Sequence, residues 1–120
     1  MANWIAVAPS YLMTLARVGS GAGPDFVRLH AIGAIAAGRK IYLKRCASCH
    51  GRTGNGDGPD AVDLGIHPAK FSDPSLRQES DGALFWKITV GKKPMPDYGD
   101  RLSPNDRWNV INFLRTLGTK

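Results

Sequence analysis

Cys46, Cys49 and His50 are the residues of this sequence best suited to chemistry, and they stand together in the pentapeptide Cys-Ala-Ser-Cys-His. Two thiols at this spacing, followed directly by a histidine, are typical of covalent haem attachment. One turn of helix would bring both sulfurs to the two vinyl groups on one porphyrin edge, and the histidine would lie under the iron as its proximal ligand. The motif therefore predicts one covalent haem c, held by Cys46 and Cys49, with its iron bound by His50.

Two other uses of paired cysteines fit this sequence less well. A structural zinc site needs four ligands, whereas the chain has two Cys and three His, and His67 is far from the usual finger spacing. A thioredoxin-like redox pair stands between a strand and a helix, and no strand pattern is visible. Haem attachment is therefore the favoured interpretation.

The sixth iron ligand is expected to be Met95, in the loop Pro94-Met95-Pro96. The flanking prolines restrict φ and stiffen the loop, so the thioether can be presented with little loss of entropy. A thioether suits low-spin iron and raises the reduction potential relative to a second histidine. The rival ligands are His67, His30 and Met13. His67 is more simply explained as a surface or pocket-lining residue, and His30 as a packing or solvent-exposed one.

Three main helices are expected, at about 25–46, 80–90 and 103–117. The second can be capped by Ser80 or Asp81, and the third begins at Ser103 with Pro104 in its first turn. The Gly- and Pro-rich stretch 51–75 predicts a long loop with a helical turn near 60–64. Within it, GNGDGP at 54–59 lacks the Gly-Lys-Ser/Thr end of a phosphate loop and predicts a tight turn instead.

Charge and hydropathy narrow the choice of partners. The 120 residues carry a net charge of +6, but the Lys and Arg residues are scattered, with only short doublets such as Lys92-Lys93. Nucleic acid is therefore not expected as a partner, and an acidic protein is favoured. No apolar stretch is long enough to cross a bilayer. The first 16 residues lack the positive charge that normally precedes the apolar core of a secretory signal.

From about residue 37 to residue 117 the chain resembles a class I monohaem cytochrome c. Four segments carry the resemblance: GRKIY at 38–42, CASCHGRTGNGDGP at 46–59, DGALFWKITVGKKPMPDY at 81–98 and LSPNDRWNVINFLRTL at 102–117. The resemblance implies an all-α fold of three main helices around one haem, with Met95 as the sixth ligand. It also implies that the carbonyl of Pro59 accepts the His50 N–H. Gly38 and Tyr42 are expected to meet Phe113, while Trp86 and Trp108 are expected either to reach the haem or to pack in the core.

The expected function is single-electron transfer, either as a soluble carrier or as the cytochrome subunit of a larger redox complex. Two filled axial positions leave the iron no open site, so the alternative, a haem enzyme or gas-binding protein, requires a vacant or labile sixth site. Residues 25–120 are expected to form the cytochrome domain. Residues 1–24 have no counterpart in the family and are expected to be an extension that could dock a partner. Haem attachment of this kind predicts a periplasmic or otherwise extracytoplasmic protein.

Overall fold

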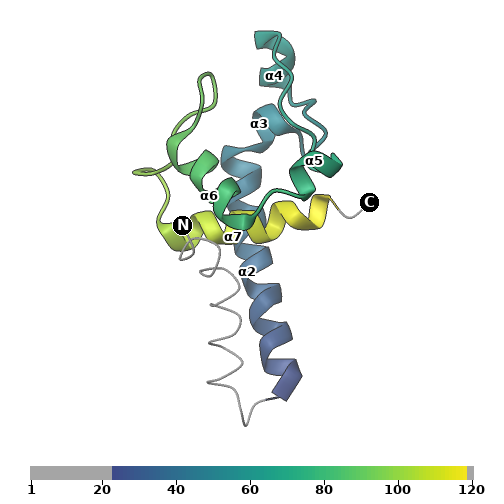
Figure 1. Cartoon of the computed structure of the whole chain (residues 1–120), viewed down its shortest axis with the longest axis vertical. Coiled ribbons are helices and arrows are strands. Elements are labelled where there is room, and N and C mark those ends of the chain that lie inside the picture. The colour runs from purple at the N-terminus through teal and green to yellow at the C-terminus, as the bar shows by residue number, and fades with distance from the viewer. Residues whose placement is uncertain (1–22, 119–120) are drawn as a thin grey trace.

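We describe residues 23–118 in a computed structural model, with side chains from residue 31 onward. Residues 1–22 and 119–120 lie outside the description, and almost all of the expected N-terminal extension falls there. The helices, in chain order, are α2 (Gly23–Arg45), α3 (Ala47–His50), α4 (Pro59–Leu64), α5 (Pro74–Arg77), α6 (Asp81–Val90) and α7 (Pro104–Leu117). The long helix α2 extends well beyond the part of the molecule that gathers around α7 (Figure 1).

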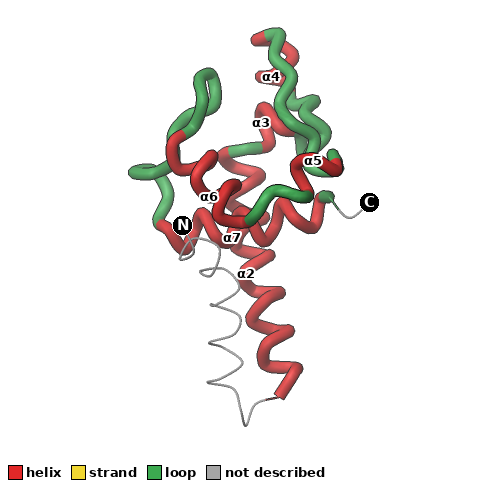
Figure 2. The backbone as a smooth tube through the Cα atoms, viewed as in Figure 1, coloured by secondary structure: helices red, strands yellow, loops and turns green. Residues whose placement is uncertain are grey.

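The described part of the chain contains helices and loops and no strand (Figure 2). Its one β-type contact is an isolated bridge between Lys92 and Met95. The predicted all-α fold with three main helices is therefore confirmed, with α2, α6 and α7 in those roles. No helix within residues 23–118 is both long enough and apolar enough to cross a bilayer.

The helices α2 and α7 cross at Gly38, where the two backbones nearly touch. A Cβ atom at Gly38 would overlap the backbone carbonyl of Asn109 and lie 3.1 Å from Cβ of Phe113. One turn further along α2, the fully buried ring of Tyr42 packs against Phe113 with 5.2 Å between ring centroids. The predicted meeting of these residues is confirmed, and it fixes the end of α2 that leads into the cysteine motif.

Both α6 and α7 begin at a serine cap; of the two expected candidates for α6, the cap is Ser80 and not Asp81. The Ser80 hydroxyl accepts from the Ala83 N–H at 3.0 Å, and the Ser103 hydroxyl accepts from the Asp106 N–H at 3.1 Å. Each cap satisfies one backbone donor that the first turn of a helix leaves unpaired. The two helices bury apolar side chains in the common core, among them Leu84, Phe85, Ile88, Val110, Ile111, Phe113 and Leu114.

The short helix α5 was not expected from the sequence, and Arg115 of α7 holds the chain that follows it. The Arg115 guanidinium donates to the backbone carbonyls of Leu76, Arg77 and Glu79. It also forms an ion pair with Asp81 at 3.0 Å. One side chain thereby fastens the connection between α5 and α6 to the last helix.

Candidate haem attachment and ligation site

The cysteine motif forms a helical turn directly after α2. The Cys46 N–H donates to the Tyr42 carbonyl at 2.8 Å, and the His50 N–H donates to the Cys46 carbonyl at 2.9 Å. The first bond continues the pattern of α2 and the second closes α3, so the motif makes one turn between them. Both cysteines are free thiols and are partly buried. The turn therefore presents two thiols and an imidazole together, as covalent haem attachment requires.

The pKa of the Cys46 thiol bears on which use of a cysteine pair this site can support. Burial, and secondarily the neighbouring Cys49, raise the pKa of Cys46 to about 12. A catalytic redox cysteine or a zinc ligand acts as a thiolate, which a lowered pKa favours. In addition, no three His, Cys, Asp or Glu side chains gather into a metal-binding group within the described residues. The raised pKa argues against the thioredoxin-like alternative, and the lack of a ligand group among the described residues argues against the zinc site.

His50 has an imidazole suited to binding iron. Burial lowers its pKa, while a backbone contact with Ala69 raises it to a smaller extent, so the neutral ring is favoured. Its Nδ1 atom is buried and has no hydrogen-bond partner among the described residues. The ring stacks on Phe71, with 5.0 Å between centroids and 23° between planes. A neutral, partly buried ring whose Nδ1 atom is buried and unpaired fits a haem ligand, because buried polar atoms are otherwise nearly always paired.

The glycine-rich turn at 54–59 wraps around the cysteine motif. Gly56 donates its N–H to the His50 carbonyl at 2.8 Å, and Gly58 donates to the Cys49 carbonyl at 3.1 Å. A Cβ at Gly58 would overlap the carbonyl of Ser48, so this close approach requires glycine. The turn thus satisfies backbone acceptors of the motif. Pro59 begins α4 just beyond it, and its expected hydrogen bond from His50 stays a prediction, because Nδ1 of His50 is unpaired here.

Met95 lies in a tight turn after α6. The N–H groups of Lys92 and Met95 each donate to the other residue's carbonyl, at 3.2 and 2.8 Å respectively. The side chain is partly buried and packs against the same core as Cys46. Of the rivals, His67 is exposed, the side chain of His30 is not described, and Met13 lies outside the described residues. The fold thus brings Met95 and the cysteine motif to one core.

Two tyrosines hold the backbone on either side of the motif. The Tyr98 hydroxyl donates to the carbonyl of Arg45 at 3.0 Å, immediately before Cys46. The Tyr42 hydroxyl donates to the carbonyl of Gly51 at 2.6 Å, immediately after His50. Sequence reasoning assigned Tyr42 only a packing role and did not single out Tyr98. The aromatic residue three positions after Met95 was the one available signal for the second contact.

The two tryptophans near the core behave differently. Trp108 is buried and stacks on Phe85 with 4.2 Å between ring centroids, which confirms the core role. Trp86 is 60% exposed, so of its two expected roles core packing is wrong, while contact with the haem stays a prediction. A feature missed from the sequence is Arg107, which is buried with its guanidinium 4.6 Å from the Phe85 ring centroid. Arg107 donates to the Thr89 hydroxyl at 2.6 Å and so links α7 to α6.

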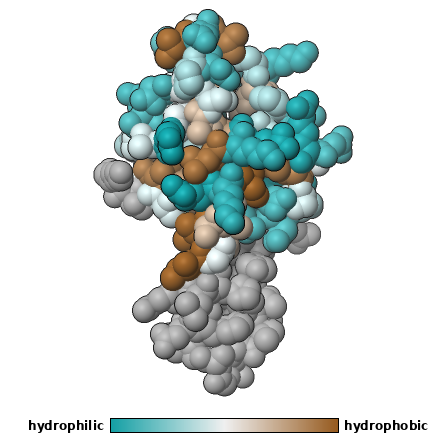
Figure 3. All heavy atoms as spheres, turned by 180° about the vertical axis from the view of Figure 1, so that it is seen from behind, coloured by the Kyte–Doolittle hydropathy of each residue, from teal (hydrophilic) through white to brown (hydrophobic). Residues whose placement is uncertain are grey.

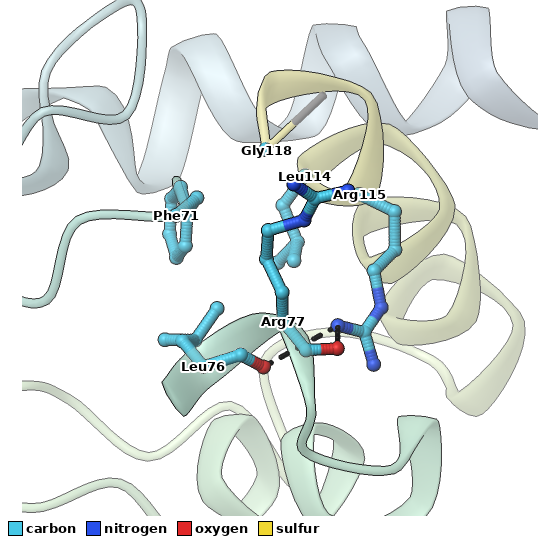
Figure 4. A pocket seen from close by; sticks show the side chains of 6 residues that line it. All are labelled: Phe71, Leu76, Arg77, Leu114, Arg115 and Gly118. Atoms are coloured by element: carbon cyan, nitrogen blue, oxygen red, sulfur yellow. Dashed lines mark hydrogen bonds between the residues drawn. The ribbon is translucent and has the colours of Figure 1, made fainter. Parts of the chain in front are cut away.

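A pocket of about 250 Å³ lies where Phe71, Leu76, Arg77, Leu114, Arg115 and Gly118 meet (Figure 4). Figure 4 shows the Arg115 guanidinium tied to the carbonyls of Leu76 and Arg77 along its edge. Among the residues that line the pocket, Phe71 also contacts the cysteine motif, because its ring stacks on that of His50. We therefore treat this pocket as part of the packing between α5 and α7 and place the chemistry at the cysteine motif.

Comparison with known proteins agrees with this site. The family described as cytochrome c oxidase, cbb3-type, subunit III matches residues 33–114. A cytochrome c6 of Alaria esculenta is 29% identical over 83 residues, which cover 69% of this chain and 91% of that protein. A cytochrome bc1 complex cytochrome c subunit of Corynebacterium diphtheriae is 30% identical, with 68% of this chain and 27% of that protein covered.

A solved structure shares the fold as well. A chain of the reducing HAO-like protein complex of Kuenenia stuttgartiensis matches with a TM-score of 0.61 and 33% sequence identity. The match covers 70% of this chain and 43% of that one. The fold, the motif and these relatives define a monohaem c-type cytochrome. The chain belongs to the matched cytochrome c family; it binds haem c covalently and transfers electrons to or from redox partner proteins.

Proposed function

We propose that Cys46 and Cys49 are the two attachment points of the haem. Each thiol would add across one vinyl group, with the sulfur bonding one carbon and the thiol hydrogen going to the other, so that no group leaves. The observation that supports the proposal most is the single helical turn that presents both thiols beside His50.

His50 and Met95 are the proposed axial ligands. His50 contributes a partly buried imidazole whose pKa is lowered by burial, and Met95 contributes a thioether from a turn closed by two backbone hydrogen bonds. Haem, when bound, would supply the one-electron chemistry, and these two residues would provide its iron ligands. Pro59 remains the proposed carbonyl partner of His50, as the resemblance to class I cytochromes implies.

The axial assignment is tested by Met95→Ala, with His67→Ala as the matched control. Met95→Ala is expected to retain covalent haem but lose the near-infrared band of methionine-ligated ferric haem and to lower the reduction potential. His67→Ala is expected to leave both unchanged, because His67 is exposed. A wild type that lacks the methionine band, with a spectrum that is unchanged in Met95→Ala and altered in His67→Ala, would transfer the ligand role to His67.

For the working context, we propose an extracytoplasmic subunit of a redox complex, with residues 25–120 as the cytochrome domain. Residues 1–24 would contact the partner, since they have no counterpart in the family. The relatives named as cytochrome c6 and as a bc1 complex subunit support an electron-transfer role, but leave a mobile carrier as the alternative. Positive side chains exposed near the motif and the Met95 turn, namely Lys44, Arg45, Lys92 and Lys93, suit a partner with an acidic face.

The dependence of the electron-transfer rate on ionic strength distinguishes a fixed subunit from a mobile carrier. Exposed charges are screened over about 8 Å at physiological ionic strength, so electrostatic steering weakens as salt is added. For a preassembled complex held through residues 1–24, the rate of electron transfer to the native partner should stay flat with salt. It should fall when residues 1–24 are deleted. A steep fall with salt in the full chain, unaffected by the deletion, would indicate the mobile carrier instead.

A further inference from the structure

Helix α6 is apolar on its outer face as well as its inner one. Its buried residues include Leu84, Phe85 and Ile88. Ala83, Trp86, Lys87 and Val90 follow one another at spacings of three, one and three residues, which places them on one stripe of the helix. Three of these four outward residues are apolar. Apolar side chains on the outer face of a surface helix are normally covered by another element or by a partner.

This outer face is open in the structure. Trp86 is 60% exposed and Val90 44% exposed, and both lie on the same stripe one turn apart. Tryptophan is the residue type with the largest apolar surface to hide and is enriched at the energetic centres of protein interfaces. An exposed Trp–Val pair of this kind marks a contact surface that the described residues of the chain do not fill.

The charges beside the stripe indicate what would cover it. Lys92 and Lys93 follow the end of α6 and are exposed, and neither has a carboxylate partner among the described residues. Lys87, on the stripe itself, is balanced by an ion pair with Glu79 at 2.7 Å. The acidic Asp97 and Asp100 lie further along the loop. The stripe is therefore apolar in its middle, and the two residues that follow its end, Lys92 and Lys93, are positive, whereas Asp97 and Asp100 lie beyond Met95.

A second apolar site on the molecule serves as a contrast. Val62 and Leu64 on α4 are 70% and 60% exposed. Figure 3 shows apolar side chains exposed at the end of the molecule that α4 forms. Their neighbours in the helix are the exposed acids Asp60 and Asp63. The apolar side chains on α4 are thus exposed to a similar extent as those on α6. The charged residues beside them are negative on α4 and positive after α6.

We propose that the outer face of α6, formed by Trp86 and Val90 with Lys92 and Lys93 at its end, is the docking surface for the redox partner. The partner's matching surface has an apolar centre with carboxylates along one edge. The inference deepens the proposed function, because it rests on Met95 as a haem ligand. Contact at this stripe places the partner beside the turn that carries Met95.

The test uses the full holoprotein and gold electrodes coated with monolayers as stand-ins for the partner. One monolayer ends in carboxylates alone, and the other mixes carboxylate and methyl ends. The half-saturating concentration for adsorption is measured on both for wild type, Trp86→Gln, Val62→Gln and the Lys92→Glu/Lys93→Glu double variant. Wild type should adsorb more tightly to the mixed monolayer. On the mixed monolayer, Trp86→Gln should have a half-saturating concentration about tenfold higher than wild type, equivalent to about 1.4 kcal/mol of adsorption free energy. Val62→Gln should have the same half-saturating concentration as wild type. The double lysine variant should lose binding to both monolayers.

Three results would overturn the docking proposal. Equal loss in Val62→Gln and Trp86→Gln would mean general apolar adhesion. Equal adsorption of wild type to both monolayers would remove the apolar contribution. A shifted reduction potential or near-infrared band in Trp86→Gln would mean that Trp86 contacts the haem. Failure of the underlying ligand assignment is seen separately, as a missing near-infrared band in the wild type before any electrode is used.

Discussion

The hydroxyl of Tyr98 donates a hydrogen bond to the carbonyl of Arg45 across 3.0 Å, joining residues that are 53 positions apart. Tyr98 lies in the loop that carries Met95, and Arg45 is the last residue of α2 before Cys46. The bond thus connects the loop of one proposed axial ligand with the start of the attachment motif. Two further bonds, Tyr98 N–H to the Ile88 carbonyl and Gly99 N–H to the Thr89 carbonyl, hold the loop to α6.

Tyr98→Phe is expected to loosen the Met95 loop. The variant keeps the ring and loses the bond to Arg45, at a cost of about 1 kcal/mol in the free energy of unfolding. On heating, the near-infrared methionine band should disappear at a lower temperature than in wild type, before the helices unfold. The matched control is Tyr42→Phe, which should lower the stability of the whole fold without separating the two transitions. Coincident transitions in Tyr98→Phe would contradict a specific role for this bond.

The stability of the protein should fall at high pH because of Tyr42. Burial, followed by the neighbouring Cys46 and Asp57, raises the pKa of Tyr42 above its usual value. Since the folded pKa lies above the unfolded value of about 10, this contribution is complete below pH 10 and decreases as the pH rises beyond it. The pKa of Tyr98 is also raised, mainly by burial, so ionisation of Tyr98 lowers the stability at high pH as well.

Denaturant midpoints at increasing pH from 8 upward measure this effect. The wild-type midpoint should decrease above about pH 10, and the decrease should be smaller in Tyr42→Phe. The burial contribution persists when the Cys46 sulfur is a thioether, so the holoprotein is suitable for the measurement. A Tyr42→Phe profile that falls as steeply as wild type would show that Tyr42 is not responsible.

Gly38→Ala should destabilise the crossing of α2 and α7. The added Cβ overlaps the backbone of Asn109, which cannot move aside as a flexible side chain could. We expect a loss of about 1–3 kcal/mol in the free energy of unfolding, the range typical of overpacked cores. Gly33→Ala, in the same helix, is the matched control, since a Cβ there would meet nothing within 4 Å. The free energy of unfolding of Gly33→Ala should rise by about 0.5–1 kcal/mol, because alanine reduces the backbone entropy of the unfolded chain. Equal effects at the two glycines would rule out the close approach.

The main helices were predictable because their signals are local. Ser80 and Ser103 cap α6 and α7 as expected, and both caps depend on residues within three positions. The attachment motif is local too. By contrast, α2 begins at Gly23, two residues earlier than expected, where the linker-like sequence gives no clear start.

The features that sequence reasoning missed depend on contacts between distant segments. Arg115 fastens the chain after α5 through backbone carbonyls, which no side-chain pattern announces. Arg107 is buried against Phe85 of α6, although a charged residue in an amphipathic helix is ordinarily expected in solvent. The Trp86 error has the same origin, because periodicity identifies the buried face of α6 but not whether its opposite face is covered.

The central claim is covalent attachment of one haem through Cys46 and Cys49, and intact-mass measurement after acid–acetone treatment tests it most directly. Wild type should retain the mass of the chain plus one haem, and digestion should leave that haem on the peptide containing residues 46–50. Cys49→Ser should still allow one bond, while Cys46→Ser/Cys49→Ser should release all haem into the acetone. Haem that extracts freely from the intact wild-type protein, leaving the mass of the bare chain, would contradict the account.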